Sequence, residues 1–399
     1  MKQGWVTDRF QDVVFLQEGP GIRKYEYQND GYPMINVRCV QDGFIDMTKS
    51  RSANYELATT KWKHFQIEEG DILFTISGTI GRSAIVKKSD LPLLMNTSVV
   101  RFRPLTNELD RRFLYHIVRG KKFQDDLINQ STGTAIKNVG PSHLKKITIS
   151  YPPIPEQKRI VAKLDKAFTA IDQAKANVER NLQNAKDLFQ SELNRIFSQK
   201  GDGWVERVLS DIGQIQTGTT PPTKDKSNYG NFIPFVKPSH FNSDGTINAG
   251  DCMLSKSGLS NGRLFPAYSV LMVCIGATIG KTGFSEEPVS ANQQINCLTP
   301  TEEHNPKLFY FGLISPFVQK QVADIGKGAQ ATLPIINKSK WQKLKINIPV
   351  KKSIQDGIVI QLNELRSQAV SLEKKYLQEY DALNELKKSI LQKAFNGEL

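Results

Sequence analysis

Two long stretches of the sequence carry hydrophobic residues spaced alternately three and four positions apart. This spacing places them on one face of a helix, and its persistence over several heptads predicts a coiled coil. The first stretch follows Pro152 and is interrupted at Lys175 and Glu192, and the second is interrupted at Glu379. The hydrophobic positions are Val161, Leu164, Phe168, Ile171, Val178, Leu182, Ala185, Phe189 and Ile196, then Ile358, Leu362, Leu365, Ala369, Leu372, Tyr376, Leu383, Leu386 and Ile390.

The segment before each long helix has the pattern of a mixed globular domain. Short runs rich in β-branched and aromatic residues are bounded by Gly, Pro, Asn and Asp, which predicts strands separated by turns. Longer stretches between them predict helices. The predicted strands are 71–76, 98–102, 147–151, 270–275, 295–298 and 344–348, and the predicted helical stretches are 109–128 and 307–325.

The two halves of the chain repeat each other. The tripeptide at Gly4 returns at Gly203, 199 positions later, and the turn at 76–82 returns at 275–281. This period is far longer than the roughly 20–50 residues of solenoid repeats, so it indicates a duplicated domain and helix. A duplicated chain favours a pseudo-two-fold arrangement, which in turn suits a two-fold symmetric partner such as duplex DNA.

These patterns together predict an α+β protein with two mixed domains joined by a long antiparallel two-helix coiled coil. The expected order is a first domain (1–154), a first helix (155–200), a second domain (201–352) and a second helix (353–399). An antiparallel pair would hold the domains at opposite ends. A helical stretch of 36 residues at 1.5 Å per residue spans roughly 54 Å, so the pair is expected to act as a spacer.

Composition favours a folded protein that binds a polyanion. The chain has 399 residues, 39% of them hydrophobic, and a formal net charge of +13. Distributed positive charge is typical of nucleic-acid binding, although a basic protein without such a partner remains an alternative. The sequence shows neither a secretory signal nor a membrane-spanning run, so we expect a cytoplasmic protein. Its four cysteines lack CxxC spacing, and no metal site or disulfide is expected.

The sequence contains one motif that resembles a nucleotide-binding loop. The segment 276–282 is similar to a P-loop, but three residues instead of four separate its glycines, and the first-half copy lacks the lysine. A tight turn is the better interpretation. No catalytic elbow, zinc-protease pair or dinucleotide-binding fingerprint is found, and we expect a protein without catalytic chemistry of its own.

Two segments, 49–64 and 237–263, combine basic, amide and aromatic side chains and differ strongly between the two halves. Arg and Lys pair with guanine or phosphate, and Asn with adenine. Solvated loops have the same composition, which is the alternative for any one residue. With the two basic residues that follow the repeated turn, the candidate DNA-binding residues are Lys49, Arg51, Lys61, Lys63, His64, Arg82, Lys237, His240, Asn242, Lys256, Arg263 and Lys281.

Further hydrophobic residues lie off the predicted seam near the helix ends. On an isolated coiled coil these positions would favour polar residues, and their presence suggests two equivalent docking sites for a second kind of subunit. The candidate docking residues are Ile160, Leu188, Phe197, Ile354 and Phe395.

The chain resembles the specificity subunits of type I restriction-modification systems. The resemblance rests on Gly-Trp at each domain start, the Thr-Ile-Gly turn, Asn292-Gln293-Gln294 before a strand, the helix opening at 152–161 and the closing segment 389–399. It covers essentially the whole chain. Two segments depart from the family pattern: Asn96-Thr97-Ser98 replaces the Asn-Gln-Gln form, and 350–355 lacks the Pro-rich opening.

The resemblance implies that each domain reads one half of a bipartite, asymmetric site in double-stranded DNA. The paired helices would set the gap between the halves and dock two methyltransferase (M) subunits, and motor-endonuclease (R) subunits would join for restriction. S-adenosylmethionine, ATP and Mg²⁺ are expected on those partners, with no cofactor in this chain. The alternatives are a freestanding two-domain DNA-binding regulator with a coiled-coil spacer, and an enzyme with an unfamiliar active site.

Overall fold

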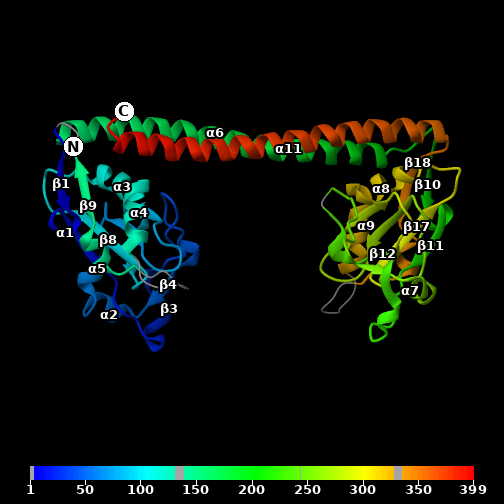
Figure 1. Cartoon of the computed structure of the whole chain (residues 1–399), viewed down its shortest axis with the longest axis horizontal. Coiled ribbons are helices and arrows are strands. Elements are labelled where there is room, and N and C mark those ends of the chain that lie inside the picture. The colour runs from blue at the N-terminus through cyan, green and yellow to red at the C-terminus, as the bar shows by residue number, and fades with distance from the viewer. Residues whose placement is uncertain (1–3, 131–138, 243, 328–334) are drawn as a thin grey trace. The chain divides into compact units, whose positions relative to one another are not determined.

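The computed structural model describes residues 4–130, 139–242, 244–327 and 335–399 (Figure 1). The chain forms two compact units. Unit 1 comprises Met1–Val178 and Glu379–Leu399, and unit 2 comprises Glu179–Gln378. Each unit therefore contains one globular domain and a part of each long helix. The long helices are α6 (Ile154–Phe197) and α11 (Lys352–Phe395).

Unit 1 contains three small sheets. The four-stranded sheet has the order β2-β8-β5-β6, the three-stranded sheet β4-β3-β7 and the two-stranded sheet β1-β9. Every pairing is antiparallel except β3 with β7. The strands are β1 (Val6–Arg9), β2 (Val14–Glu18), β3 (Tyr27–Ile35), β4 (Arg51–Ala53), β5 (Ile72–Thr75), β6 (Ser83–Ile85), β7 (Leu94–Met95), β8 (Val99–Pro104) and β9 (Thr148–Tyr151).

Unit 2 repeats these sheets in the same relative order. They are β11-β17-β14-β15, β13-β12-β16 and β10-β18, with β12 and β16 parallel. The duplication that the sequence predicts is therefore confirmed strand by strand. The strands are β10 (Trp204–Val208), β11 (Gly213–Thr217), β12 (Tyr229–Val236), β13 (Met253–Leu254), β14 (Ser269–Val273), β15 (Thr282–Ser285), β16 (Ser290–Ala291), β17 (Ile295–Pro300) and β18 (Lys345–Pro349).

Short helices flank the sheets in both units. Each helical stretch predicted as one element is two helices, because the backbone becomes extended at Gly120 in unit 1 and at Ser315 before Pro316 in unit 2. The short α-helices are α1 (Phe10–Val13), α2 (Tyr55–Thr59), α3 (Arg111–Arg119), α4 (Lys121–Gln130), α5 (Pro141–Lys146), α7 (Lys256–Asn261), α8 (Pro306–Ile314), α9 (Pro316–Lys327) and α10 (Lys338–Trp341).

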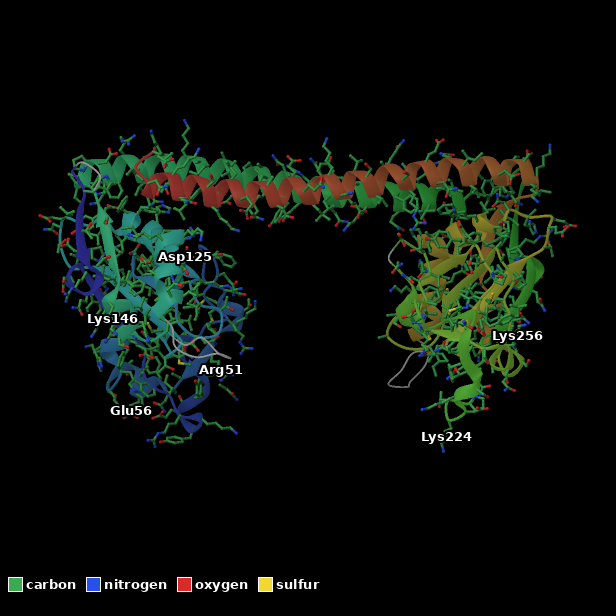
Figure 2. All side chains as sticks on the ribbon, in the orientation of Figure 1. Arg51, Glu56, Asp125, Lys146, Lys224 and Lys256 are labelled. Atoms are coloured by element: carbon green, nitrogen blue, oxygen red, sulfur yellow. The ribbon has the colours of Figure 1, made fainter. Side chains whose placement is uncertain are left out.

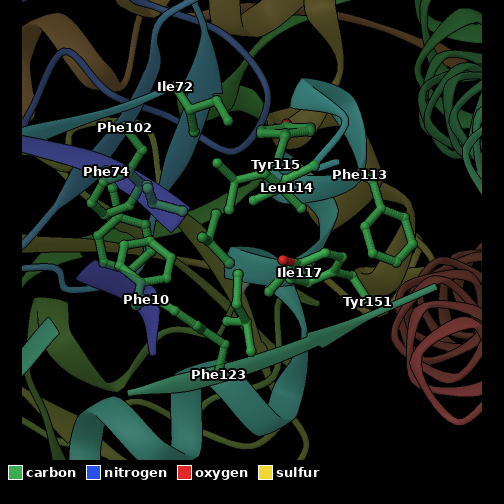
Figure 3. Close-up of a cluster of buried hydrophobic side chains, with 14 of the residues drawn as sticks. Phe10, Ile72, Phe74, Phe102, Phe113, Leu114, Tyr115, Ile117, Phe123 and Tyr151 are labelled. Carbon is green, nitrogen blue, oxygen red and sulfur yellow. The ribbon is translucent and has the colours of Figure 1, made fainter. Parts of the chain in front are cut away.

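Aromatic side chains fill the main core of unit 1 (Figure 3). Phe10 lies edge-on to Phe102 with ring centroids 5.0 Å apart, and Phe74 lies edge-on to Phe123 at 6.0 Å. The same core includes residues of both long helices, such as Leu164 of α6 and Leu391 of α11. The helices are thus part of the domain core as well as of the helix pair.

The two long helices run antiparallel within each unit. In unit 1, Lys387 Nζ lies 2.7 Å from Asp172 Oδ1 and Lys175 Nζ lies 2.9 Å from Asn384 Oδ1. In unit 2, Gln361 donates a 2.9 Å hydrogen bond to Glu192. The predicted interruptions at Lys175 and Glu192 are therefore polar contacts with the facing helix.

The predicted seam describes α6 better than α11. Every predicted seam position of α6 is buried or half-buried. On α11, however, Leu372 and Leu386 are exposed, whereas Val359 and Leu391 are buried. The predicted seam of α11 is wrong at these positions, because this helix packs against the globular domains as well as against α6.

A buried glutamine fastens the start of each long helix to its domain. Gln157 is fully buried, accepts a 2.8 Å hydrogen bond from the Asp110 amide and donates to the carbonyl oxygens of Glu108 and Pro152. Gln355 repeats this arrangement in unit 2 with the Asn305 amide and the Pro349 carbonyl. The segment 350–355 differs from the proline-rich opening of the first long helix but has the glutamine at the same place.

Candidate nucleic-acid interface

The repeated Thr-Ile-Gly segment forms a tight turn between two strands of the main sheet in each unit. Gly78 and Gly81 have φ angles of 71° and 94°, and Gly276 and Gly280 have 104° and 89°. These left-handed conformations favour glycine. The Thr75 hydroxyl donates to the Thr79 carbonyl oxygen at 2.6 Å and accepts from the Arg82 amide at 3.0 Å. The predicted tight turn is confirmed.

A glutamine that the sequence analysis did not identify holds each turn. Gln319 donates to the carbonyl oxygens of Gly280, at 3.0 Å, and Leu313, at 2.6 Å. Gln124 makes the same pair of contacts to Gly81 and Val118. The two glutamines are 195 positions apart, close to the period of the duplication, and that spacing was the signal in the sequence that could have revealed them.

The basic residues after the turns, Arg82 and Lys281, are both half-buried. Arg82 lines a cavity of about 840 Å³ in unit 1, together with Arg119, Lys387 and Lys388. Carboxylates of Asp42, Asp381 and Glu385 line the same cavity. A phosphate contact by Arg82 or Lys281 stays a prediction.

The segment 49–64 presents most of its candidate residues to solvent. Lys49 ends a short 3-10 helix and forms a 3.0 Å ion pair with Asp46. Arg51 begins β4, and its guanidinium lies 5.5 Å from the centroid of the Tyr27 ring (Figure 2). Lys61 lies 5.9 Å from the Trp62 ring. The cations are thus supported by aromatic rings, which restricts their orientation without removing them from solvent.

Lys63 and His64 lie in a 3-10 helix (Lys63–Phe65). The side chain of Arg101 forms hydrogen bonds with the backbone of this helix and of the residue after it. Arg101 is 4% exposed and donates to the carbonyl oxygens of His64 and Gln66. Asp71, which is 1% exposed, accepts from both Arg101 and Arg103. A buried ion cluster therefore fixes the segment that carries three of the candidate residues.

In unit 2 the candidates occupy corresponding loops but differ in their contacts. Lys237 and Lys256 are exposed, and Lys256 Nζ lies 5.4 Å from the Phe232 ring (Figure 2). His240 Nδ1 accepts a hydrogen bond from the Lys237 amide at 3.2 Å. Burial and the nearby Lys237 charge lower the pKa of His240. Contact of His240 with a base stays a prediction.

The remaining two candidates of unit 2 are engaged in holding their own loops. Asn242 donates to the Thr246 hydroxyl at 2.9 Å, and Arg263 donates to the Thr217 carbonyl oxygen at 2.7 Å. These bonds give both side chains a role in shaping the loops.

The structure corrects part of the predicted docking set. Ile160 and Phe197 are 1% and 0% exposed, because each helix end packs into the core of its own unit. Phe395 is half-buried and packs edge-on against Phe113, with ring centroids 5.5 Å apart. Ile160 and Phe197 are core residues, so the prediction that these two form docking surfaces is wrong, whereas docking at Phe395 stays a prediction. Leu188 and Ile354 are 59% and 45% exposed.

Among the described residues, no group of three or more His, Cys, Asp or Glu side chains is arranged to hold a metal ion. Burial raises the pKa of the Cys274 and Cys297 thiols to about 12. The helices within the described ranges include none that is both long and apolar enough to span a bilayer.

Comparison with known proteins agrees with the duplicated architecture. The model of the family described as type I restriction modification DNA specificity domain matches twice, at residues 2–180 and 201–382. The two matches cover most of the chain, one for each copy of the domain. The chain belongs to this family of DNA specificity proteins, and its two halves are DNA-recognition domains of that family.

Two individual relatives are also specificity subunits, and they match different lengths of this chain. The specificity subunit of the type I restriction enzyme HindI from Haemophilus influenzae is 31% identical over 202 residues, which is 49% of this chain and 42% of that protein. The EcoKI specificity subunit from Escherichia coli is 24% identical, over the whole of this chain and 90% of that protein. The chain thus matches less than half of one relative and nearly all of the other.

Two solved structures share the fold. One is a chain from a structural study of complex assembly and conformational transition of the type I restriction-modification system. It has a TM-score of 0.77 and 20% identity, and the match covers 100% of this chain and 99% of that chain. The other is the HsdS subunit from Thermoanaerobacter tengcongensis, with a TM-score of 0.59, 19% identity and coverage of 100% and 98%. At these identities the likeness concerns the fold.

Proposed function

We propose that this chain is the non-catalytic DNA-recognition subunit of a type I restriction-modification complex. Each domain reads one half of a bipartite, asymmetric site in double-stranded DNA. Two methyltransferase subunits carry S-adenosylmethionine and perform the methylation, and motor-endonuclease subunits that use ATP and Mg²⁺ join for restriction. This chain supplies the sequence specificity and the spacing.

One observation carries the proposal: the two units share their strand order but differ in side chains at equivalent positions. Arg101 and Arg103 of β8 both form ion pairs with Asp71, the buried residue that directly precedes β5. The equivalent positions in unit 2 hold Cys297, Thr299 and Ser269, which form a neutral polar group. The two domains thus share their strand order but differ in the buried side chains that position their loops. This combination is expected of two domains that read different sequences.

The two long helices support the proposed spacer role. Helix α6 begins in unit 1 and ends in unit 2, and α11 begins in unit 2 and ends in unit 1. Two continuous helices of 44 residues each therefore connect the domains. A change in helix length would alter the separation of the two half-sites without altering either reading surface.

The helices also expose apolar side chains that could receive methyltransferase subunits. On α11, Ile360, Val370 and Leu377 are 60%, 52% and 55% exposed. On α6, Leu188 is 59% exposed. Single exposed apolar residues are common on protein surfaces, but several on one helix pair favour an interaction with other helices.

Exchange of one domain tests the proposal. The chain would be co-expressed with the methyltransferase subunit of its own system, and methylated sites mapped across the genome. Replacing residues 1–154 by the equivalent domain of a relative should change one half-site and leave the other intact. Changes in both half-sites, or methylation of the original site without this chain, would overturn the proposed division of labour. Native mass measurement should give two methyltransferase subunits per chain.

A further inference from the structure

The hairpin formed by β3 and β4 in unit 1 contains an irregularity that the sequence analysis did not identify. Tyr27 and Tyr32 both face Ala53 in the register of the hairpin, so the four residues between them are extruded from the ladder. These residues, Gln28–Gly31, form a bulge in β3, the central strand of the three-stranded sheet, before the residues of β3 that pair with β7. Gly31 approaches the Ala53 carbonyl so closely that a side chain would collide with it.

Unit 2 has a bulge at the equivalent place. Tyr229 and Ile233 of β12 both face Leu254 of β13, and the three residues between them, 230–232, are extruded. The strand then continues in the same way in both units, with a proline next to the resumed pairing, Pro33 or Pro234. Bulges redirect side chains and are frequent beside functional sites. A bulge kept at the same place in both copies is therefore a property of the fold.

The side chains change from exposed within each bulge to buried where the strand pairing resumes. Tyr32 and Ile233, which resume the ladder, are 7% and 5% exposed, whereas Asn29, Asp30 and Asn231 are exposed. The bulges also differ between the two copies in length and in chemistry: Gln-Asn-Asp-Gly in unit 1, Gly-Asn-Phe in unit 2. Amides can pair with adenine, and a carboxylate can accept from cytosine.

Cations and aromatic rings surround both bulges. In unit 1, Arg51 lies over Tyr27, and the Gln28 side chain accepts from the Tyr55 amide at 3.4 Å. In unit 2, Lys256 lies over the half-exposed ring of Phe232, within the bulge itself. A two-stranded antiparallel ribbon fits the major groove of B-DNA, and flanking cations would contact the phosphates on either side.

We propose that these bulges are base-reading elements, with Asn29 in unit 1 and Asn231 in unit 2 contacting base edges in the major groove. This inference rests on the proposed function and deepens it, because it assigns each half-site to a defined short segment. Arg51 and Lys256, which lie beside the bulges, contact the phosphates of the DNA backbone. The different bulge lengths place the amides differently in the two copies, which suits two unrelated half-sites.

The test uses the full chain co-expressed with the methyltransferase subunit, and maps methylated sites by single-molecule sequencing. Asn29→Ala should reduce discrimination at one base pair of one half-site by roughly 10- to 100-fold, the value of one good bidentate contact. Asn231→Ala should do the same in the other half-site. Each variant is the control for the other, and Asn107→Ala, an exposed amide between β8 and α3, should leave both half-sites unchanged.

The outcomes separate this inference from the proposed function. If the unmodified complex methylates no bipartite site, the proposed function fails. If it does and both variants keep identical half-sites, the inference about the bulges fails. A uniform loss of methylation at all sequences would also overturn it, since the bulge would then serve general DNA binding. Asn29→Asp, which keeps the size but removes the donors, should shift the preferred base at the same position that Asn29→Ala relaxes.

Discussion

The side chain of Arg101 donates a 3.0 Å hydrogen bond from Nη2 to the main-chain carbonyl of His64. The arginine lies on a strand of the main sheet, and the histidine lies in a loop that carries candidate DNA-binding residues. The carboxylate of Asp71 shares the guanidinium on its other side. Arg101 is nearly inaccessible, so we expect any effect of this residue on DNA recognition to act through the loop that it positions.

Replacing Arg101 by Met should loosen this loop. The carbonyls of His64 and Gln66 would lose a donor and the buried Asp71 carboxylate would lose one of its two arginine partners, at a cost of about 1–3 kcal/mol in the free energy of unfolding. We expect altered selectivity at one half-site and an unchanged second half-site, measured by methylation mapping beside urea unfolding. Cys297→Ala, at the equivalent strand position of unit 2, is the control. Equal loss of selectivity at both half-sites would contradict the positioning role.

The buried glutamines at the helix starts should contribute similarly to stability. Gln157→Ala would leave the Asp110 amide and two carbonyl oxygens without their partner, and Gln355→Ala would leave the Asn305 amide and the Pro349 carbonyl without theirs. Each substitution should cost about 1–3 kcal/mol in the free energy of unfolding. Gln173→Ala is the matched control, because this residue bonds Asn177 on an exposed helix face. A similar effect of all three substitutions would show that burial is not the cause.

His116 should make the stability of unit 1 depend on pH. It is 3% exposed between α3 and α6, with Nε2 3.6 Å from Asp165 and with Arg112 and Arg119 nearby. Burial lowers the pKa of His116 from its ordinary value of 6.5, with the Asp165 carboxylate opposing this effect. The unfolded chain therefore takes up the proton first, and stability falls as the pH drops below about 6.5.

His116→Phe should remove this loss, since unit 2 carries Phe311 at the same place in α8, six residues after the N-cap. The measurement is the Tm of thermal unfolding between pH 7 and pH 5 for the unmodified chain and for the variant. The variant should show a smaller decrease in Tm than the unmodified chain. An identical decrease in both proteins would assign the pH dependence to other groups, of which Asp165 is the nearest.

Arg82→Ala and Lys281→Ala should each weaken binding to all DNA sequences alike if the two residues hold phosphates. Each should reduce the slope of log affinity against log salt by about one unit. The measurement is binding of the complex to its own site and to unrelated duplexes at several salt concentrations. Lys163→Ala, on the exposed face of α6, is the control. A variant that binds all DNA normally refutes its phosphate contact.

A matched pair of insertions tests the spacer. One heptad added after Val178 in α6 and another after Gln378 in α11 fall at the boundary between the units. They should lengthen the gap between half-sites by about three base pairs, since seven helical residues add about 10 Å. Methylation mapping should show unchanged half-sites. A constant gap with an altered half-site would exclude the spacer role.

The sequence predicted those parts of the molecule that follow from local pattern or from repetition. The heptad spacing predicted both long helices, which begin one residue before the predicted positions and end three and four residues before them. The repeated turn predicted its glycine conformations. The wrong assignments of Ile160 and Phe197 have one cause: a helix that packs against both another helix and a domain needs two apolar faces, which one seam cannot describe. The bulges and the Arg101 cluster depend on contacts between distant segments, which local pattern does not contain.

The division of the two long helices between the units has a consequence for synthesis. Unit 2 is one continuous segment, Glu179–Gln378, whereas the core of unit 1 needs Leu391 and Ala394 from the far end of the chain. The domain that is translated first is therefore the one completed last, after about 200 intervening residues have emerged. A nonsense mutation between Gln378 and Leu391 would consequently remove part of the core of unit 1, while every residue of unit 2 would still be synthesised.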